Sequence, residues 1–198
     1  MELEELLNKQ EGSPQVYHLL FRCLLEEKEL EKAEHHMKNF QKNYTAQPAD
    51  HKLFGQIKME QSKFREAIPH FNKALHISYK DAEMLNMRGE AILQLGEYAI
   101  AEKDFDSAYL YRPGYIPALI NRGIARIKSD RSAEGAQDLL QALENNPYNP
   151  NCHLNLGYYY ELEGDYEKAI FHFEQAKELG LEHYGLQFYI EEVRKKLN

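Results

Sequence analysis

The sequence predicts an all-α fold built from stacked helix hairpins, and two observations carry this prediction. First, glycines recur at intervals of 34 residues without an insertion, at Gly55, Gly89, Gly123 and Gly157. Second, each period contains two amphipathic stretches of about a dozen residues, separated by a break near Gly96, Gly164 or their equivalents. Each period is therefore predicted to form one helix hairpin.

Small and large residues travel with the glycines at fixed offsets and indicate how the hairpins pack. Twelve and nineteen residues after each glycine comes a small residue, which lets two helix backbones approach closely. Sixteen residues after each glycine comes a large apolar residue, which fills the space between the layers of helices. A lone hairpin cannot bury such a face, so stability must come from neighbouring hairpins. These positions hold Ala67, Ala101, Gly135 and Ala169, then Ala74, Ala108, Ala142 and Ala176, and then Phe71, Phe105, Leu139 and Phe173.

This pattern resembles the tetratricopeptide repeat family, whose 34-residue period and Leu-Gly, Tyr, Ala, Phe, Pro signature it shares. The resemblance implies a right-handed superhelical solenoid. The two clearest copies contain Leu156, Gly157, Tyr160, Gly164, Tyr166, Ala169, Phe173 and Ala176, and Gly89, Gly96, Tyr98, Ala101, Phe105, Ala108 and Pro113.

The register divides the chain into five repeats with a short segment at each end. The first copy is divergent, with Phe21 at the glycine position and Phe40 at an alanine position. Residues 1–13 are predicted to be a leader or short helix, in which Ser13 caps the first repeat ahead of Pro14. The repeats span 14–47, 48–81, 82–115, 116–149 and 150–183.

Residues 184–198 are predicted to form a C-terminal capping helix that keeps the end of the solenoid soluble. Leu186, Ile190, Val193 and Leu197 share one helical face. The alternative is a detachable amphipathic segment for a membrane or a partner, but the stripe is short and its polar side mixes both signs of charge.

Composition narrows the function classes and the location. The net charge is −8 and basic residues are scattered among acidic ones, so we expect no nucleic-acid partner. We also expect no membrane span, because no run of about twenty apolar residues exists. Cys23 and Cys152 fall in the first and last repeats, too far apart for a disulfide, and two free thiols fit a reducing, cytoplasmic location.

An enzyme is not predicted, and neither is a metal or a cofactor. His35 and His36 are adjacent and point about 100° apart on a helix, while His70, His76 and His172 have no His or Cys three or four residues away. We therefore interpret the histidines as surface residues. No glycine-rich phosphate loop or nucleophile elbow occurs in the sequence.

The resemblance implies instead a binding groove lined by the first helix of each repeat, at its second, fifth, sixth and ninth positions. Asn121 and Asn155 share the sixth position in adjacent repeats, where amides can donate and accept hydrogen bonds to an extended peptide. The alternative is that these asparagines cap or pair within the solenoid. The predicted peptide-binding residues are Lys52, Gln56, Asn86, Glu90, Ile120, Asn121, Ile124, Asn155 and Tyr158.

The clamp that holds the carboxylate of chaperone tails in this family is not supported. The helix before Asn121 offers Asn86 and Glu90 where the clamp has Lys and Asn, and the helix after it offers Asn151 and Asn155 where the clamp has Lys and Arg. An uncharged or partly apolar ligand is expected instead. The sequence thus predicts a non-enzymatic adaptor that binds a peptide segment or helix of a partner protein.

A self-assembling scaffold, acting through its ends or its convex face as a homo-oligomer, is the main alternative function. Charged residues predicted on the convex face count mildly against a large apolar interface between copies. They include Glu102, Lys103, Asp104 and Asp106.

Overall fold

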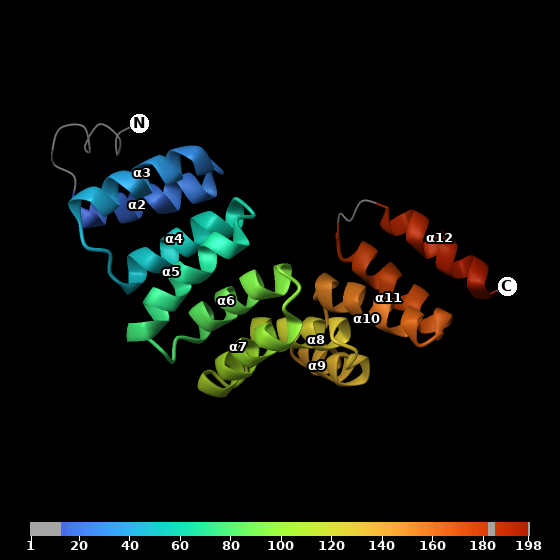
Figure 1. The fold of residues 1–198 in the computed structure, drawn as a ribbon. Helices are drawn as coiled ribbons and strands as arrows, with labels where there is room; N and C mark the ends of the chain where they lie inside the picture. The colour runs from blue at the N-terminus through green and yellow to red at the C-terminus, as the bar shows by residue number, and fades with distance from the viewer. Residues whose placement is uncertain (1–12, 182–184, 198) are drawn as a thin grey trace. The chain divides into compact units, whose positions relative to one another are not determined.

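The computed structural model describes residues 13–181 and 185–197, which contain helices and no strand (Figure 1). The all-α prediction is therefore confirmed. The predicted N-terminal leader lies outside the described residues, apart from Ser13. The first helices of the hairpins begin 34 residues apart and are α2 (Pro14–Glu26), α4 (Pro48–Glu60), α6 (Ala82–Gln94), α8 (Ile116–Lys128) and α10 (Pro150–Leu162). The second helices are α3 (Leu30–Asn43), α5 (Phe64–Ile77), α7 (Tyr98–Tyr111), α9 (Ser132–Asn145) and α11 (Tyr166–Glu178), followed by α12 (Leu186–Leu197).

The helices form two compact units, Met1–Glu97 and Tyr98–Asn198. In the first unit, α2 packs on α3, α4 on α5 and α5 on α6, and the first helices α2, α4 and α6 contact one another in succession. In the second unit, each helix from α7 to α12 packs on the next, and α8 also contacts α10. The boundary after Glu97 falls inside the third predicted repeat.

Local chemistry explains where the helices begin and turn. Ser13 Oγ accepts a hydrogen bond from the Val16 amide, and Pro14 occupies the first turn. Asn149 caps α10 in the same way, with its Oδ1 3.0 Å from the Cys152 amide nitrogen. At the hairpin turns, Gly96 and Gly164 adopt φ angles of +79° and +78°, a left-handed conformation that costs glycine little.

The glycines that define the period provide room for a neighbouring helix in two different ways. A Cβ added at Gly157 would lie 2.5 Å from the Phe173 ring, so this glycine makes space for an aromatic side chain. A Cβ added at Gly123 would lie 2.8 Å from the Gly135 carbonyl oxygen, so here two backbones meet directly. Both contacts are too short for any larger residue without movement of the hairpin.

Two of the four charged residues of α7 that were expected on an open face, Glu102 and Asp104, are buried in the second unit, whereas Lys103 and Asp106 are exposed. Glu102 and Asp104 are only 8% and 7% exposed. Glu102 accepts hydrogen bonds from Arg126 Nε and Arg131 Nη1, both at 2.8 Å. The pattern of charge along α7 could not reveal the burial of Glu102, because that carboxylate is paired with arginines from the following hairpin.

The C-terminal helix α12 packs on α11 and buries most of its predicted apolar face. Leu186, Ile190 and Val193 are buried, whereas Leu197 is exposed. Phe188 lies elsewhere on α12 and is 65% exposed. The helix therefore covers α11 and also presents an aromatic side chain to solvent.

Candidate functional site

The predicted groove residues of the first unit lie on α4 and α6. Lys52 Nζ lies 2.6 Å from Glu83 Oε2, which ties the two helices together. Asn86 is only 4% exposed, and its Nδ2 donates to Glu90 Oε1 at 2.8 Å. Asn86 therefore orients the Glu90 carboxylate, and its buried position suits it to that role more than to direct contact with a ligand.

Two of these residues, Gln56 and Glu90, line a pocket of about 260 Å³ in the first unit. We call it the methionine pocket, after Met59 and Met87. Gln56 and Glu90 occupy the ninth position of their helices and Met87 the sixth, so predicted groove positions of successive repeats meet here. The full lining is Leu25, Gln56, Met59, Glu60, Met87 and Glu90.

In the second unit, the predicted isoleucines serve mainly the core. Ile120 is 9% exposed and belongs to the cluster of buried residues around Leu119 and Leu139. Ile124 is partly buried and packs against the same cluster. Asn121 lies beside them on α8 and is half-buried.

The remaining predicted residues, Asn155 and Tyr158, lie on α10. Asn155 Nδ2 donates to the carbonyl oxygen of Asn151 in its own helix at 2.8 Å, so the amide nitrogen is engaged and the amide oxygen can accept from a ligand. The Tyr158 ring lies 5.2 Å from Phe173 and 5.5 Å from Tyr189, measured between centroids. Burial, with a contribution from Glu161, raises the pKa of Tyr158.

Helix α12 adds one side chain to this surface that the sequence reasoning missed, Tyr189. Tyr189 Oη donates to Glu161 Oε2 at 2.8 Å, and burial raises the pKa of Tyr189 to about 12. Phe188 and Tyr189 follow Leu154 and Asn155 by one 34-residue period. Extending the register past residue 183 could therefore have found them.

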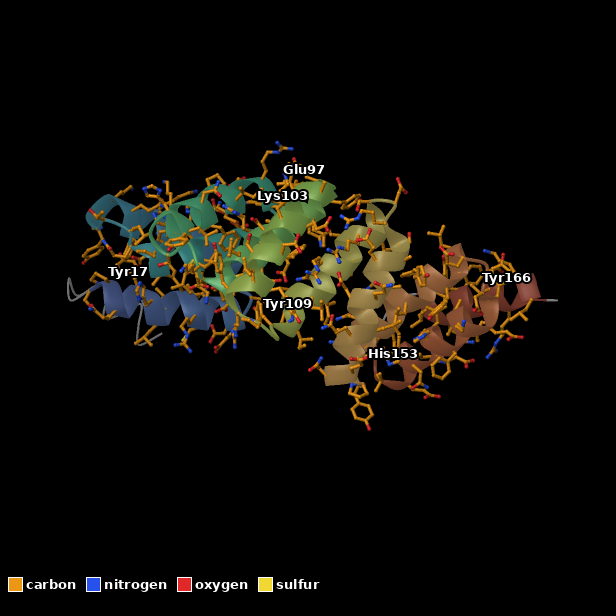
Figure 2. The ribbon with its side chains drawn as sticks, turned by 90° about the horizontal axis from the view of Figure 1, so that it is seen from below. Tyr17, Glu97, Lys103, Tyr109, His153 and Tyr166 are labelled. Carbon is orange, nitrogen blue, oxygen red and sulfur yellow. The ribbon has the colours of Figure 1, made fainter. Side chains whose placement is uncertain are left out.

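Two histidine pairs also escaped the sequence reasoning. His51 and His70 face each other across the hairpin of α4 and α5, with their Nδ1 atoms 3.4 Å apart. His153, which is labelled in Figure 2, faces His172 across the hairpin of α10 and α11, with their Nδ1 atoms 3.0 Å apart. The interpretation as surface residues is wrong for His153 and His172, which are buried. The two pairs lie three 34-residue periods apart, which is the signal that the sequence offered.

Within residues 13–181 and 185–197, no three His, Cys, Asp or Glu side chains come together in a way that could hold a metal ion. Among the helices of the same residues, none combines the length and the apolar character needed to cross a membrane. Cys23 and Cys152 are both free thiols, and burial raises the pKa of Cys152 to about 12.

Two stretches of the chain match models of a known protein family. Two models, both described as tetratricopeptide repeat, match residues 53–115 and 139–171. No protein of curated function matches the chain in sequence.

Among solved structures, PilW, described as a widely conserved type IV pilus biogenesis factor, is 19% identical with a TM-score of 0.80, over 93% of this chain and 88% of PilW. Pseudomonas aeruginosa pilF is 16% identical with a TM-score of 0.75, over 92% of this chain and 84% of that one. YrrB, described as a TPR protein with an unusual peptide-binding site, is 17% identical with a TM-score of 0.69, over 97% and 98% of the two chains. At these identities the likeness establishes the fold.

Proposed function

Because this chain belongs to the tetratricopeptide repeat family, we propose that it is a non-enzymatic adaptor that binds a peptide segment or helix of a partner protein along its first helices. The fold itself supports a protein–protein interaction module. The proposal adds the place of binding and its chemistry, which reside in the side chains and not in the fold.

The observation that carries the proposal is the methionine pocket. Gln56 on α4 and Glu90 on α6 were predicted to face a ligand because they share the ninth position of successive repeats, and both line this pocket. Concave sites that combine apolar walls with a few polar groups are where proteins usually bind ligands. A segment crossing the first helices of the first unit would meet the pocket.

The second unit supports the proposal with a different set of contacts. The Asn155 amide oxygen can accept a hydrogen bond from a peptide N–H, while its nitrogen stays bonded to Asn151. The rings of Tyr158 and Tyr189 lie against each other and supply apolar area next to it. An extended segment would use the amide for its backbone and the aromatic rings for its side chains.

The test is an affinity capture from native lysate with the wild-type chain and the Asn121→Ala, Asn155→Ala double variant, read by mass spectrometry. We expect one or more proteins to be retained by the wild type and lost with the variant, while thermal unfolding changes little. The matched control is Asn145→Ala on α9, which removes the same kind of bond, Nδ2 to the carbonyl oxygen four residues earlier. Equal retention by all three chains would rule out a site at these asparagines.

Self-assembly is separated from partner binding by the same experiment together with light scattering over a range of concentrations. Recovery of the chain alone, with a mass that grows with concentration, would replace the adaptor with a homo-oligomeric scaffold. A cytoplasmic location also belongs to the proposal and is supported by the two free thiols. Cell fractionation that finds the protein in another compartment would overturn the cytoplasmic location.

A further inference from the structure

We propose that the methionine pocket is a subsite for one long basic side chain, lysine or arginine, of the bound segment. This inference rests on the proposed function and specifies the chemistry of the partner. It is carried by three features of the pocket: an apolar floor, a carboxylate rim and the helix ends that surround it.

The floor is apolar and adaptable. Met59 and Met87 are partly buried and pack on the cluster of Ala67, Phe71 and Ala91. Methionine is unbranched and polarisable, so two methionines can shape themselves around a flexible chain. The aliphatic stem of lysine or arginine buries readily on such a surface while its charged end reaches past it.

The rim carries two carboxylates, Glu60 on α4 and Glu90 on α6. Asn86 donates to Glu90 Oε1 and so fixes the direction of that carboxylate. A carboxylate offers about four acceptor sites on its two oxygens, so Glu90 can take further donors while it keeps this bond. A guanidinium or ammonium group would supply them.

One cation of the chain itself already uses this rim, since Lys28 Nζ forms an ion pair with Glu60 Oε2. Lys28 and Glu60 are both exposed in this pair, which makes it a weak contact that a ligand can share or displace. The pair shows that an ammonium group can reach the rim.

The ends of the surrounding helices also favour a positively charged ligand. Leu25 lies in the last turn of α2, and Met59 and Glu60 lie in the last turn of α4. The C-terminal end of a helix carries roughly half a negative charge, which favours a nearby cation. The last turn of α2 contains no basic residue to offset it, whereas the last turn of α4 contains Lys58. The end of α2 and the two carboxylates thus make the site unsuitable for an acidic side chain or a terminal carboxylate.

A direct test uses the methionine methyl groups as reporters. The chain has 5 methionines, so ¹³C-methyl labelling gives a spectrum simple enough to assign by substitution. The probes are the N-acetyl, N-methylamide derivatives of arginine and norleucine at millimolar concentration. We expect the arginine probe to shift the Met59 and Met87 resonances in a saturable way and to leave those of buried Met37 and Met84 unchanged.

Variants then separate charge from apolar contact. Glu90→Gln keeps the shape of the side chain and removes its charge, and we expect it to weaken the arginine probe about tenfold, the usual loss for a hydrogen bond to a charged group. Glu97→Gln, an exposed substitution outside the pocket lining, is the matched control and should have no effect. Equal binding of norleucine and arginine, or no shift at Met59 and Met87, would overturn the proposal.

A random peptide library displayed on phage distinguishes this subsite from groove binding in general. Selection on the wild type should enrich sequences with lysine or arginine at one fixed position, and selection on Glu60→Gln, Glu90→Gln should lose that preference while still yielding binders. Binders without a basic preference would overturn the subsite and leave the proposed function intact. A failure to enrich any peptide would count against the proposed function, and the methyl shifts would then decide on the pocket alone.

Discussion

The Nδ1 atom of His153 lies 3.0 Å from the Nδ1 atom of His172, inside the hairpin of α10 and α11. His153 Nε2 lies 3.1 Å from the carbonyl oxygen of Pro147, and because a carbonyl only accepts, Nε2 must carry the proton. In the neutral ring, His153 Nδ1 is then the acceptor and His172 Nδ1–H the donor. A hydrogen bond between the two histidine rings thus joins the two helices of the hairpin.

Stability is predicted to fall in mild acid because of these histidines. Burial, with the nearby charges of His153 and Lys168, lowers the pKa of His172 from 6.5 to about 4, and burial likewise lowers the pKa of His70 to about 4. The unfolded chain therefore binds more protons than the folded chain between these values. The stabilisation is fully present above pH 6.5 and is lost as the pH falls towards 4. Urea unfolding at pH values from 8 to 4 should show midpoints that decline across this window.

Substitutions test whether His70 and His172 cause this loss of stability in acid. The double variant His70→Phe, His172→Phe keeps an aromatic ring in each hairpin and should flatten the decline, whereas His76→Gln at an exposed position should not. The charged or titratable groups that act on these pairs are Lys73, Lys58, Glu66 and Asp50 in the first unit and Lys168 in the second. An unchanged slope in the double variant would assign the acid sensitivity to other groups.

Gly123→Ala is predicted to destabilise the chain by about 1 to 3 kcal/mol, the usual cost of overpacking. The new Cβ would lie 2.8 Å from the Gly135 carbonyl oxygen, and a backbone atom cannot move aside as a flexible side chain can. Urea unfolding followed by circular dichroism measures the loss. Ala133→Leu, at an exposed position of the same hairpin, should stay within about 0.5 kcal/mol. A wild-type midpoint for Gly123→Ala would show that the two backbones are not in contact.

Asp138→Ala should cost about 1.5 to 3 kcal/mol, the usual contribution of hydrogen bonds to charged groups, because it removes the buried acceptor that Arg122 and Arg126 share. Arg122 then keeps only its bond to Asp106, and Arg126 keeps its bond to Glu102. Asp138 receives Arg122 Nε and Nη2 at 2.9 and 2.7 Å, and Arg126 Nη1 at 2.8 Å. The control is Asp106→Ala: its side chain is 48% exposed and pairs with Arg122 alone at short range, so its loss should stay within about 1 kcal/mol. Equal losses in denaturant unfolding would mean that the network does not depend on burial.

The two faces of α12 should respond differently to truncation. Ile190→Ala removes a buried side chain and is expected to cost about 2 to 5 kcal/mol, whereas Phe188→Ala removes an exposed one and should change stability little. Hydrogen exchange of the α12 amides would detect the first effect. Weaker capture of a partner by Phe188→Ala, with unchanged stability, would extend the binding surface onto α12.

The order of helices and the residues at repeated positions could be predicted from sequence, because they depend on local chemistry. Ser13 and Pro14 begin a helix through their own hydrogen bonding and backbone angles, and Gly123 marks a close approach because no other residue fits. The register likewise predicted that Gln56 and Glu90 would face the same way on successive first helices, and both line one pocket.

The partners of the polar side chains were decided only by the tertiary structure. His153 and His172 are 19 residues apart, so nothing local joins them until two helices pack face to face. Glu102 is buried because arginines from the next hairpin reach it, and the Asn155 amide nitrogen turns to Asn151 within its own helix. The sequence by itself determined the helices and their repeat, because the spacing of apolar and small residues follows from helix geometry alone. Which polar groups meet is decided by interhelical packing, because a hydrogen bond needs two atoms within about 3 Å of each other.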